Sequence, residues 1–324
     1  MKAIVYTDYG PPEVLRLAEV SKSTPKEDEV LLEIWAASVN PLDWHFMRGS
    51  PYFLRLMAGL RQPKVNRLGV DVAGVVEAVG RNVTQFQPGD GVFGVCRGAF
   101  AESVCAPAKG LVRKPANLTF EQAAAVPIAA ISALKGLRDK GQLQRGQKVL
   151  INGAAGGVGT FAVQLARMFG ADVTGVCRTR NVELVRSLGA AHVIDYTKEN
   201  FTQSEQRYDV ILDTVGNHSL SDCRRALTAA GTLVMVGGPN TRRWLGPMSG
   251  MLTSLVCAPF VSQKLRPFLA HLHGDDLNVL RELLETGKIV PSIDRSYSLQ
   301  EVPAAIRYLE EGHARGKVVI TMST

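Results

Sequence analysis

The chain has 324 residues, of which 46% are hydrophobic and 21% charged, as in a globular protein large enough for two domains. Its net charge is +7, but the basic residues are dispersed and not interleaved with aromatic ones, so we expect no nucleic-acid binding. The five cysteines form no CxxC pair, and MKAIVYTDYG lacks the apolar core of a signal peptide, so we expect a cytoplasmic protein. No run of about 18 apolar residues occurs, so we expect no membrane span.

Residues 1 to about 120 predict a β-rich domain. The segments 30–39 (VLLEIWAASV) and 72–80 (VAGVVEAVG) have the composition of strands, and 87–94 (QPGDGVFG) is a tight turn leading into another strand. Short strands separated by glycine and proline turns are typical of a β-barrel or a β-sandwich.

The pattern changes at Thr119, which is the expected N-cap of a helix over 119–140. From there strands and helices alternate, which is typical of a parallel sheet with helices on both faces. We expect strands at 148–154, 172–178, 192–196, 208–216 and 232–238, and helices at 158–170, 182–189 and 219–231. Further on we expect helices at 276–289 and 302–314, and a last strand at 317–322 that rejoins the first domain.

The turn after the strand at 148–154 is rich in glycine. In VLINGAAGGVG (149–159), Ala154, Gly156 and Gly159 occupy the three positions of a dinucleotide-binding fingerprint. Alanine at the first position departs from the strict pattern, since a left-handed conformation there favours glycine. The strand–turn–helix–strand context favours a pyrophosphate cradle at the helix N-terminus over an ordinary tight turn. The expected contacts are Ala154, Ala155, Gly156, Gly157, Val158 and Gly159.

The end of the following strand discriminates between NAD and NADP. An acid that binds the ribose is expected about 20 residues after the glycines in NAD-dependent proteins. This sequence has GVCRTRN (175–181) there, with Arg178, Arg180 and Asn181 and no acid. Guanidinium groups match a 2′-phosphate, so we predict NADPH; the alternative is that both arginines are merely solvated on a loop.

Several segments together resemble a known family. LGVDVAGVVEAVG, AAAVPIAAISAL, LGAAHVIDY and GHARGKVVIT, with the glycine turn, are similar to the medium-chain dehydrogenase/reductase superfamily, in its zinc-free quinone oxidoreductase branch. The resemblance implies a GroES-like β-barrel catalytic domain at 1–122, resumed at 291–324, and a Rossmann dinucleotide-binding domain at 123–290. It also implies an active site in the cleft between the domains, and a homodimer or a tetramer built from dimers.

The residues at the zinc positions of related enzymes are different here. Zinc-dependent relatives carry a cysteine where this chain has Asn40, and Gly-His-Glu where it has GVD (69–71). A catalytic zinc normally takes three protein ligands, so we predict no metal. Without a Lewis acid, the expected small-molecule electron acceptor is a quinone or an α,β-unsaturated carbonyl, which accepts hydride with less help.

The resemblance also assigns roles near the nicotinamide. Asn40 matches an asparagine whose amide is expected to hydrogen-bond the cofactor or a substrate oxygen; otherwise it is a turn residue before Pro41. Asp43 belongs to the same region, with a structural hydrogen bond as the alternative. His45 is the candidate proton donor, or a surface histidine. Ser132 stands where relatives carry a threonine that contacts the nicotinamide, or it is simply a helix-interior serine.

Four further positions follow from the same resemblance. Tyr196 matches a tyrosine near the adenosine part of the cofactor, or packs on the sheet as a strand-end aromatic residue. Gly237 and Gly238 end a strand where the nicotinamide half should lie, or form an ordinary turn. Lys317 matches a basic residue near the cofactor phosphates, or lies on the surface.

Two other interpretations stay open. Because few reactive residues stand out, the chain is alternatively an NADPH-binding protein with little turnover, acting as a structural or partner-binding module. The basic and apolar stretch 48–67 additionally allows membrane contact, at most of the peripheral kind.

Overall fold

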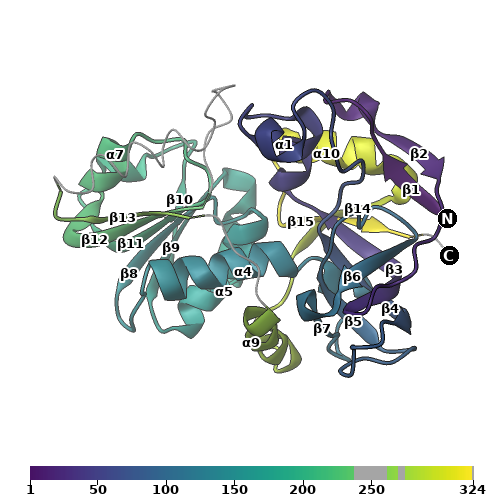
Figure 1. The fold of residues 1–324 in the computed structure, drawn as a ribbon. Helices are drawn as coiled ribbons and strands as arrows, with labels where there is room; N and C mark the ends of the chain where they lie inside the picture. The colour runs from purple at the N-terminus through teal and green to yellow at the C-terminus, as the bar shows by residue number, and fades with distance from the viewer. Residues whose placement is uncertain (237–260, 269–273, 323–324) are drawn as a thin grey trace. The chain divides into compact units, whose positions relative to one another are not determined.

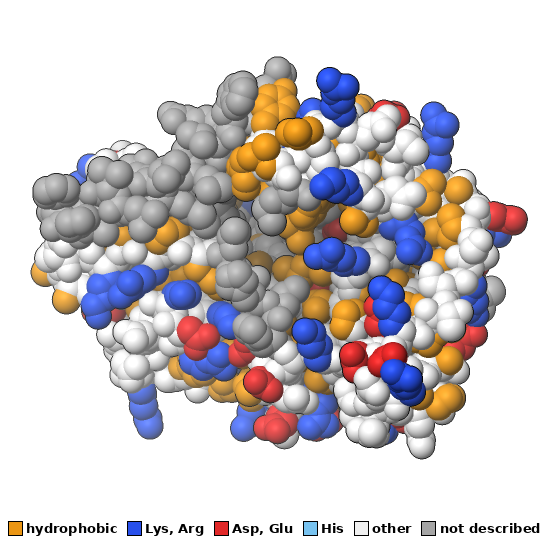
Figure 2. Space-filling model, viewed as in Figure 1, with side chains coloured by type: hydrophobic (Ala, Val, Ile, Leu, Met, Phe, Trp, Pro, Cys, Tyr) orange, Lys and Arg blue, Asp and Glu red, His pale blue; other side chains and the backbone are white. Residues whose placement is uncertain are grey.

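The computed structural model describes residues 1–236, 261–268 and 274–322 (Figure 1). The chain divides into two compact units: a first unit of Met1–Ile131 with Leu272–Thr324, and a second unit of Ser132–His271. Among the residues that the structure describes, no helix has both the length and the apolar character needed to cross a bilayer. On the face drawn in Figure 2, lysine and arginine side chains are scattered among apolar and acidic ones.

The first unit is built on a seven-stranded sheet in the order β14-β15-β3-β4-β5-β7, with β6 also paired to β3. The eleven-residue strand β3 is its centre: β4 pairs along one edge, while β6 and β15 share the other edge. Leu32, Met47 and Phe100 are among the side chains buried in its core. The strands are β1 (Lys2–Val5), β2 (Arg16–Glu19), β3 (Glu29–Val39), β4 (Asp71–Val79), β5 (Gly91–Val95), β6 (Ser103–Pro107), β7 (Leu111–Arg113), β14 (Ile293–Ser298) and β15 (Lys317–Thr321).

The antiparallel pairing of β15 with β3 confirms that the last strand rejoins the first domain. The helices of this unit are α1 (Pro41–Arg48), α2 (Leu54–Ala58), α3 (Phe120–Ala124), α9 (Gly274–Glu285) and α10 (Val302–Glu310), and α4 (Pro127–Lys135) continues into the second unit. Compared with the predicted domain bounds, 123–131 and 272–290 group with the first unit. Packing of α3 on β3 and β4, and of α9 on β7, accounts for the difference.

The second unit is a six-stranded parallel sheet in the order β10-β9-β8-β11-β12-β13. Counted along the chain this is the order 3-2-1-4-5-6 of dinucleotide-binding folds, which reverses between β8 and β11. The strands are β8 (Lys148–Asn152), β9 (Asp172–Cys177), β10 (His192–Asp195), β11 (Tyr208–Asp213), β12 (Leu227–Met235) and β13 (Lys264–Pro267), and the helices α5 (Gly157–Met168), α6 (Val182–Ser187) and α7 (Leu220–Arg225).

Two predicted helices differ from the observed ones. The helix over 119–140 is confirmed at its start, where Thr119 Oγ accepts the Gln122 N–H, but it breaks at Ala125. Pro127 explains the break, since it has no N–H to donate and disfavours helical backbone at the residue before it. The helix over 219–231 ends at Arg225, because Leu227 already pairs with Tyr208 as part of β12. Strand pairing here overrides the helix propensity of the alanines.

Candidate functional site

The glycine turn, defined as Gly153–Gly159, joins β8 to α5 at the point where the strand order reverses. The residue with positive φ is Gly153, at +86°, and a Cβ there would lie 2.4 Å from Thr214 Oγ. The prediction that Ala154 fills the left-handed position is therefore wrong by one residue. Ala154 is fully buried, and its N–H donates to Val176 O at 3.0 Å.

Gly159 and Gly156 differ in what a Cβ added at each position would meet. A Cβ on Gly159 would lie 2.1 Å from Gly153 O, so Gly159 is required for close packing of α5 on the turn. A Cβ on Gly156, the N-cap of α5, would meet only Gly153 O, at 3.4 Å. The protein itself thus leaves the space beside Gly156 open, at a helix N-terminus whose N–H groups suit an anion. This arrangement fits the pyrophosphate of a dinucleotide.

Side chains at the ends of β8 and β11 fix the turn. Asn152 Nδ2 donates to Asp213 Oδ1 at 2.9 Å, and the same oxygen accepts the N–H groups of Val215 and Gly216. Thr214 Oγ donates to Asn152 O at 2.7 Å. The sequence interpretation missed Gly153, Asn152 and Asp213. The signal that could have revealed the last two is that each is a polar residue at the end of a strand, directly after a run of apolar residues.

The residues predicted to bind the adenosine part follow β9 and β10. Asp195 pairs with Cys177 at the carboxyl ends of these strands, so Tyr196 and Arg178 come directly after paired residues. Both are exposed, Tyr196 to 52%. The sheet therefore brings the two residues to one edge, and the exposed tyrosine is not packed as the alternative interpretation expected.

Asp195 links the two loops that follow β9 and β10. Its carboxylate accepts the hydroxyls of Thr179 at 2.6 Å and Thr197 at 2.7 Å, and the Thr179 bond is the main cause that lowers the pKa of Asp195 to about 2. Arg180 is exposed, whereas Asn181 is buried and its Oδ1 has no hydrogen-bond partner within the described part of the chain. The predicted residues Gly237 and Gly238 lie outside the described residues.

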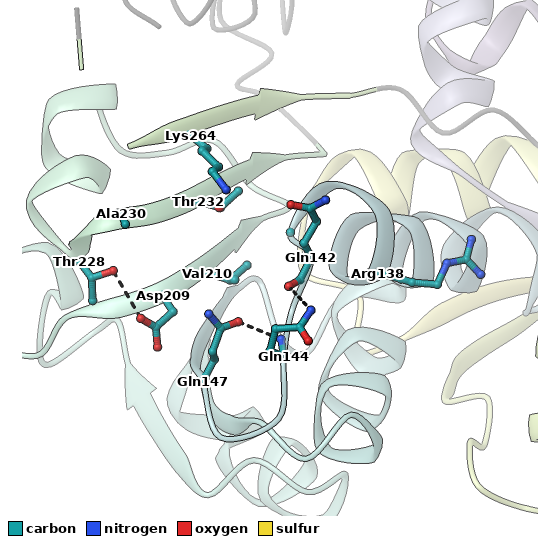
Figure 3. Close-up of a pocket in the computed structure, with 11 residues that line it drawn as sticks. Arg138, Gln142, Gln144, Gln147, Asp209, Val210, Thr228, Ala230, Thr232 and Lys264 are labelled. Atoms are coloured by element: carbon teal, nitrogen blue, oxygen red, sulfur yellow. Dashed lines mark hydrogen bonds between the residues drawn. The ribbon is translucent and has the colours of Figure 1, made fainter. Parts of the chain in front are cut away.

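A separate polar cavity of about 570 Å³ lies at the amino ends of the strands of this sheet, opposite to the end that carries the glycine turn (Figure 3). Its lining includes Gln147, directly before β8, Asp209 in β11 and Lys264 at the start of β13. In parallel α/β sheets dinucleotides bind at the carboxyl ends of the strands, so this cavity is not the cofactor site.

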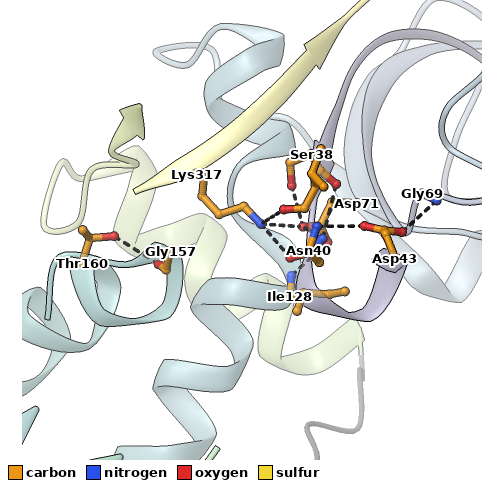
Figure 4. A network of polar contacts seen from close by, with 10 residues as sticks. Ser38, Asn40, Asp43, Gly69, Asp71, Ile128, Gly157, Thr160 and Lys317 are labelled. Atoms are coloured by element: carbon orange, nitrogen blue, oxygen red, sulfur yellow. Dashed lines mark hydrogen bonds and ion pairs between the residues drawn. The ribbon is translucent and has the colours of Figure 1, made fainter. Parts of the chain in front are cut away.

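In the first unit, four buried side chains form what we call the Lys317 cluster: Ser38, Asn40, Asp71 and Lys317 (Figure 4). Lys317 Nζ donates to Asn40 Oδ1 at 2.7 Å and to Val39 O at 3.2 Å, and lies 3.4 Å from Asp71 Oδ2. Asp71 also accepts the Ser38 hydroxyl at 2.7 Å, and its Oδ1 accepts the Ile128 N–H at 3.0 Å. Burial lowers the pKa of Lys317, and attraction to Asp71 opposes that change. Lys317 is only 3% exposed, so the surface alternative is wrong.

The cluster fixes which way the Asn40 amide points. An ammonium group only donates and a carboxylate only accepts, so Oδ1 faces Lys317 and Nδ2 faces Asp71, at 2.9 Å. The second Nδ2 hydrogen donates to Ser38 O at 3.3 Å. Both amide hydrogens of Asn40 are therefore used within the protein, while Oδ1 keeps one lone pair. Asn40 can accept a hydrogen bond from an N–H or O–H group of a ligand, but it has no N–H left to donate to a substrate oxygen.

Asp43 is bonded entirely to backbone. Its Oδ2 accepts the Asn40 N–H at 2.8 Å at the start of α1, and its Oδ1 accepts the Gly69 N–H at 2.9 Å. Burial raises the pKa of Asp43 to about 7, against the effect of these two hydrogen bonds. This geometry matches the structural alternative for Asp43.

His45 is half-buried and stacks on Trp44, with 3.7 Å between ring centroids. Its Nδ1 lies 2.7 Å from Ser50 O, and since a carbonyl only accepts, Nδ1 carries the hydrogen and Nε2 is an acceptor in the neutral ring. Burial lowers the pKa of His45, so proton donation from Nε2 requires an imidazolium that burial disfavours. Ser132 is buried within α4.

The described residues contain no group of three or more His, Cys, Asp or Glu side chains arranged to hold a metal ion. Asp71, which stands at a zinc-site position of related enzymes, is instead bonded to Lys317, Ser38, Asn40 and the Ile128 N–H. This donor set does not fit a zinc site, because the one carboxylate at that position is already neutralised by an ammonium group.

A barrel-like β unit and a parallel sheet with a glycine turn at a helix N-terminus are typical of two-domain dehydrogenases and reductases. Residues 26–116 match the family described as "Alcohol dehydrogenase GroES-like domain", and 188–320 match "Zinc-binding dehydrogenase". The chain belongs to the medium-chain dehydrogenase/reductase superfamily, in its quinone oxidoreductase branch. The predicted fold of a GroES-like barrel and a Rossmann-type sheet is confirmed.

Similar proteins match nearly the whole chain. "2-methylene-furan-3-one reductase" of Solanum lycopersicum is 36% identical over 99% of this chain and 79% of its own length. "NADPH-dependent alkenal/one oxidoreductase, chloroplastic" of Arabidopsis thaliana is 35% identical, with the same coverage. Among solved structures, the quinone oxidoreductase of Coxiella burnetii has a TM-score of 0.87 at 30% identity, covering 100% of this chain and 99% of its own. The Escherichia coli quinone oxidoreductase complexed with NADPH has a TM-score of 0.84 at 25% identity, covering 99% and 100%.

Proposed function

We propose that this chain is an oxidoreductase that transfers hydride from NADPH to a quinone or an α,β-unsaturated carbonyl compound, without zinc. The observation that carries the proposal is the open space beside Gly156 at the N-terminus of α5, which suits the close approach of a pyrophosphate. Relatives named as an NADPH-dependent alkenal/one oxidoreductase and as quinone oxidoreductases support the choice of acceptor.

The preference for NADPH is supported by charge at the end of β9. Arg178 and Arg180 are both exposed there, and both carboxylate oxygens of Asp195, at the end of β10, accept hydrogen bonds from Thr179 and Thr197. Two guanidinium groups suit a 2′-phosphate, whereas the segment 175–181 contains no acid that would accept a ribose 2′-hydroxyl.

The chain's own residues have separable tasks in this proposal. When bound, the cofactor supplies the hydride. The glycine turn holds its pyrophosphate, and Tyr196 offers a ring face to the adenine. Asn40 presents an acceptor to an N–H or O–H group, in an orientation held by Lys317 and Asp71. His45 supplies a proton only as imidazolium, so a rate that depends on it should fall as the pH rises.

Binding and turnover are tested separately. Titrations with NADPH and NADH should give a lower Kd for NADPH, and equal values would contradict the assigned cofactor. Stopped-flow oxidation of bound NADPH by quinones, enals and enones then tests the reaction. Stoichiometric zinc in the purified protein, lost together with activity, would refute zinc independence.

The alternative of an NADPH-binding protein with little turnover is favoured by one observation. The N–H donors of Asn40 and Lys317 and both oxygens of Asp43 are already engaged within the protein. If NADPH binds but no acceptor oxidises it faster than buffer does, this alternative replaces the enzyme. The homodimer and the cytoplasmic location stay predictions, to be checked by analytical ultracentrifugation and cell fractionation.

A further inference from the structure

One stretch of the first unit has an unusual charge. Residues 44–70 contain no aspartate or glutamate, although the chain has 30 acidic residues, about one in eleven. The same stretch has five cations: Arg48, Arg55, Arg61, Lys64 and Arg67. It is therefore a local basic surface and not a reflection of the average composition.

Apolar side chains protrude from the same stretch. Leu56 is 71% exposed and Leu60 is 68% exposed, the two highest values among the large hydrophobic residues that the structure describes, and Val65 is 49% exposed. We call residues 56–65 the apolar turn. Figure 2 shows hydrophobic side chains gathered on the surface in the region where Figure 1 labels α1. Single exposed leucines are ordinary, but two such residues and a valine within ten positions are not.

The backbone that carries these side chains is well bonded. Tyr9 Oη donates to Gly59 O at 2.7 Å, and the Lys64 N–H donates to Ala58 O at 2.7 Å. Gly59 has a φ of +120°, and a Cβ there would lie 2.0 Å from Gln62 O. The backbone conformation between Leu56 and Leu60 is thus fixed by hydrogen bonds and by the requirement for glycine at position 59.

The side chain of Arg55, the residue directly before the turn, is held by residues outside it. Its guanidinium carbon lies 4.5 Å from the Tyr9 ring centroid and 4.9 Å from that of Tyr52, while Nε donates to Gly49 O at 3.0 Å. Arg61 and Lys64 are exposed. The structure therefore places exposed apolar side chains and exposed cations in one short stretch of well-bonded backbone.

We propose that the apolar turn docks on an anionic lipid surface, as a property separate from hydride transfer. Leucine and valine tips suit the boundary between headgroups and acyl chains, and cations beside them suit lipid phosphates. A second copy of the chain is a poor occupant, because the exposed cations Arg61 and Lys64 of one copy would face those of the other and repel them. Lining of a substrate pocket is also disfavoured for Leu56 and Leu60, since side chains about two-thirds exposed are not enclosed by a cavity.

Co-sedimentation with vesicles tests the proposal on the full chain. Wild type should bind vesicles of phosphatidylcholine that contain phosphatidylglycerol, bind pure phosphatidylcholine far less, and be released by added salt. Leu56→Ser/Leu60→Ser should weaken binding by about tenfold or more, and Arg61→Gln/Lys64→Gln by about tenfold. Matched controls remove similar groups elsewhere: Leu17→Ser/Val279→Ser removes exposed apolar side chains, and Lys140→Gln/Lys288→Gln removes exposed charges.

Several outcomes would overturn it. One is that wild type does not sediment with anionic vesicles at low salt. Another is that the control pairs weaken binding as much as the turn pairs, which would indicate a general charge effect. A third is that Leu56→Ser/Leu60→Ser converts a dimer into a monomer in ultracentrifugation, which would make the turn a subunit interface. Far-UV circular dichroism melts and the NADPH Kd show whether each variant is folded.

Discussion

The glycine turn is built from backbone, whereas the Lys317 cluster is built from side chains. Gly153, Gly156 and Gly159 act through the absence of a Cβ, within seven consecutive residues. The cluster instead joins residues at 38–40, 71 and 317, which only the pairing of β3 with β4 and β15 brings together. The turn should therefore respond to added volume and the cluster to lost charge, and the two kinds of damage should be separable.

The largest effect is expected from removing the cation of the cluster. Lys317→Met leaves Asp71 buried without its ammonium partner, which should lower the free energy of unfolding by about 3–5 kcal/mol. Urea denaturation measures the loss. NADPH affinity should change little in any protein that stays folded, because the ammonium hydrogens are engaged within the cluster.

A double variant serves as the control for this loss. Asp71→Asn/Lys317→Met removes both charges and keeps an oxygen acceptor, so it should be more stable than Lys317→Met alone. Equal stability of the two variants would mean that the charge on Asp71 is not what destabilises the single variant. A large loss of NADPH affinity in the folded single variant would instead support the phosphate contact that the family resemblance implies.

The second prediction contrasts two glycines of the turn. Gly159→Ala places a Cβ 2.1 Å from Gly153 O and should destabilise the protein by about 1–3 kcal/mol. Gly156→Ala meets nothing closer than 3.4 Å, so its urea midpoint should match wild type while its Kd for NADPH rises by about tenfold or more. Unchanged NADPH binding by Gly156→Ala would remove the main support for the cofactor site.

The same contrast explains what the sequence could predict. The glycine turn, the alternation of strands and helices, and the return of β15 are local patterns or depend on a single pairing, and they were predicted. Asp71 and Ser38 carry no local signal, because their roles depend on residues 246 and 33 positions away. The conformation of Gly153 was missed by one position, since the fingerprint spacing does not specify φ. The helix over 219–231 failed for a long-range reason, as Leu227 pairs with Tyr208.

The third prediction concerns the arginines after β9. Arg178→Gln/Arg180→Gln should raise the Kd for NADPH by about tenfold and leave the Kd for NADH nearly unchanged, because only NADPH carries the 2′-phosphate. Arg186→Gln/Arg207→Gln, which removes two exposed arginines elsewhere in the second unit, is the matched control. Parallel loss of both cofactors would show that the arginines act on the fold of the loop and not on the phosphate.

The smallest effect is expected from the protonation of His45, which should make its contribution to stability depend on pH. Burial lowers the pKa of His45, so the folded protein takes up a proton less readily than the unfolded chain, whose histidine pKa is about 6.5. The contribution of His45 to stability is thus fully present above the unfolded value and is lost as the pH falls through the folded one. Between about pH 7 and pH 5, wild type should lose stability relative to His45→Gln, by less than about 1 kcal/mol. The glycine turn contains no titratable side chain, so Gly156→Ala should follow wild type across the same range. Urea midpoints of the three proteins measured at several pH values decide the point, and a constant difference between wild type and His45→Gln would mean that the folded environment does not disfavour the imidazolium.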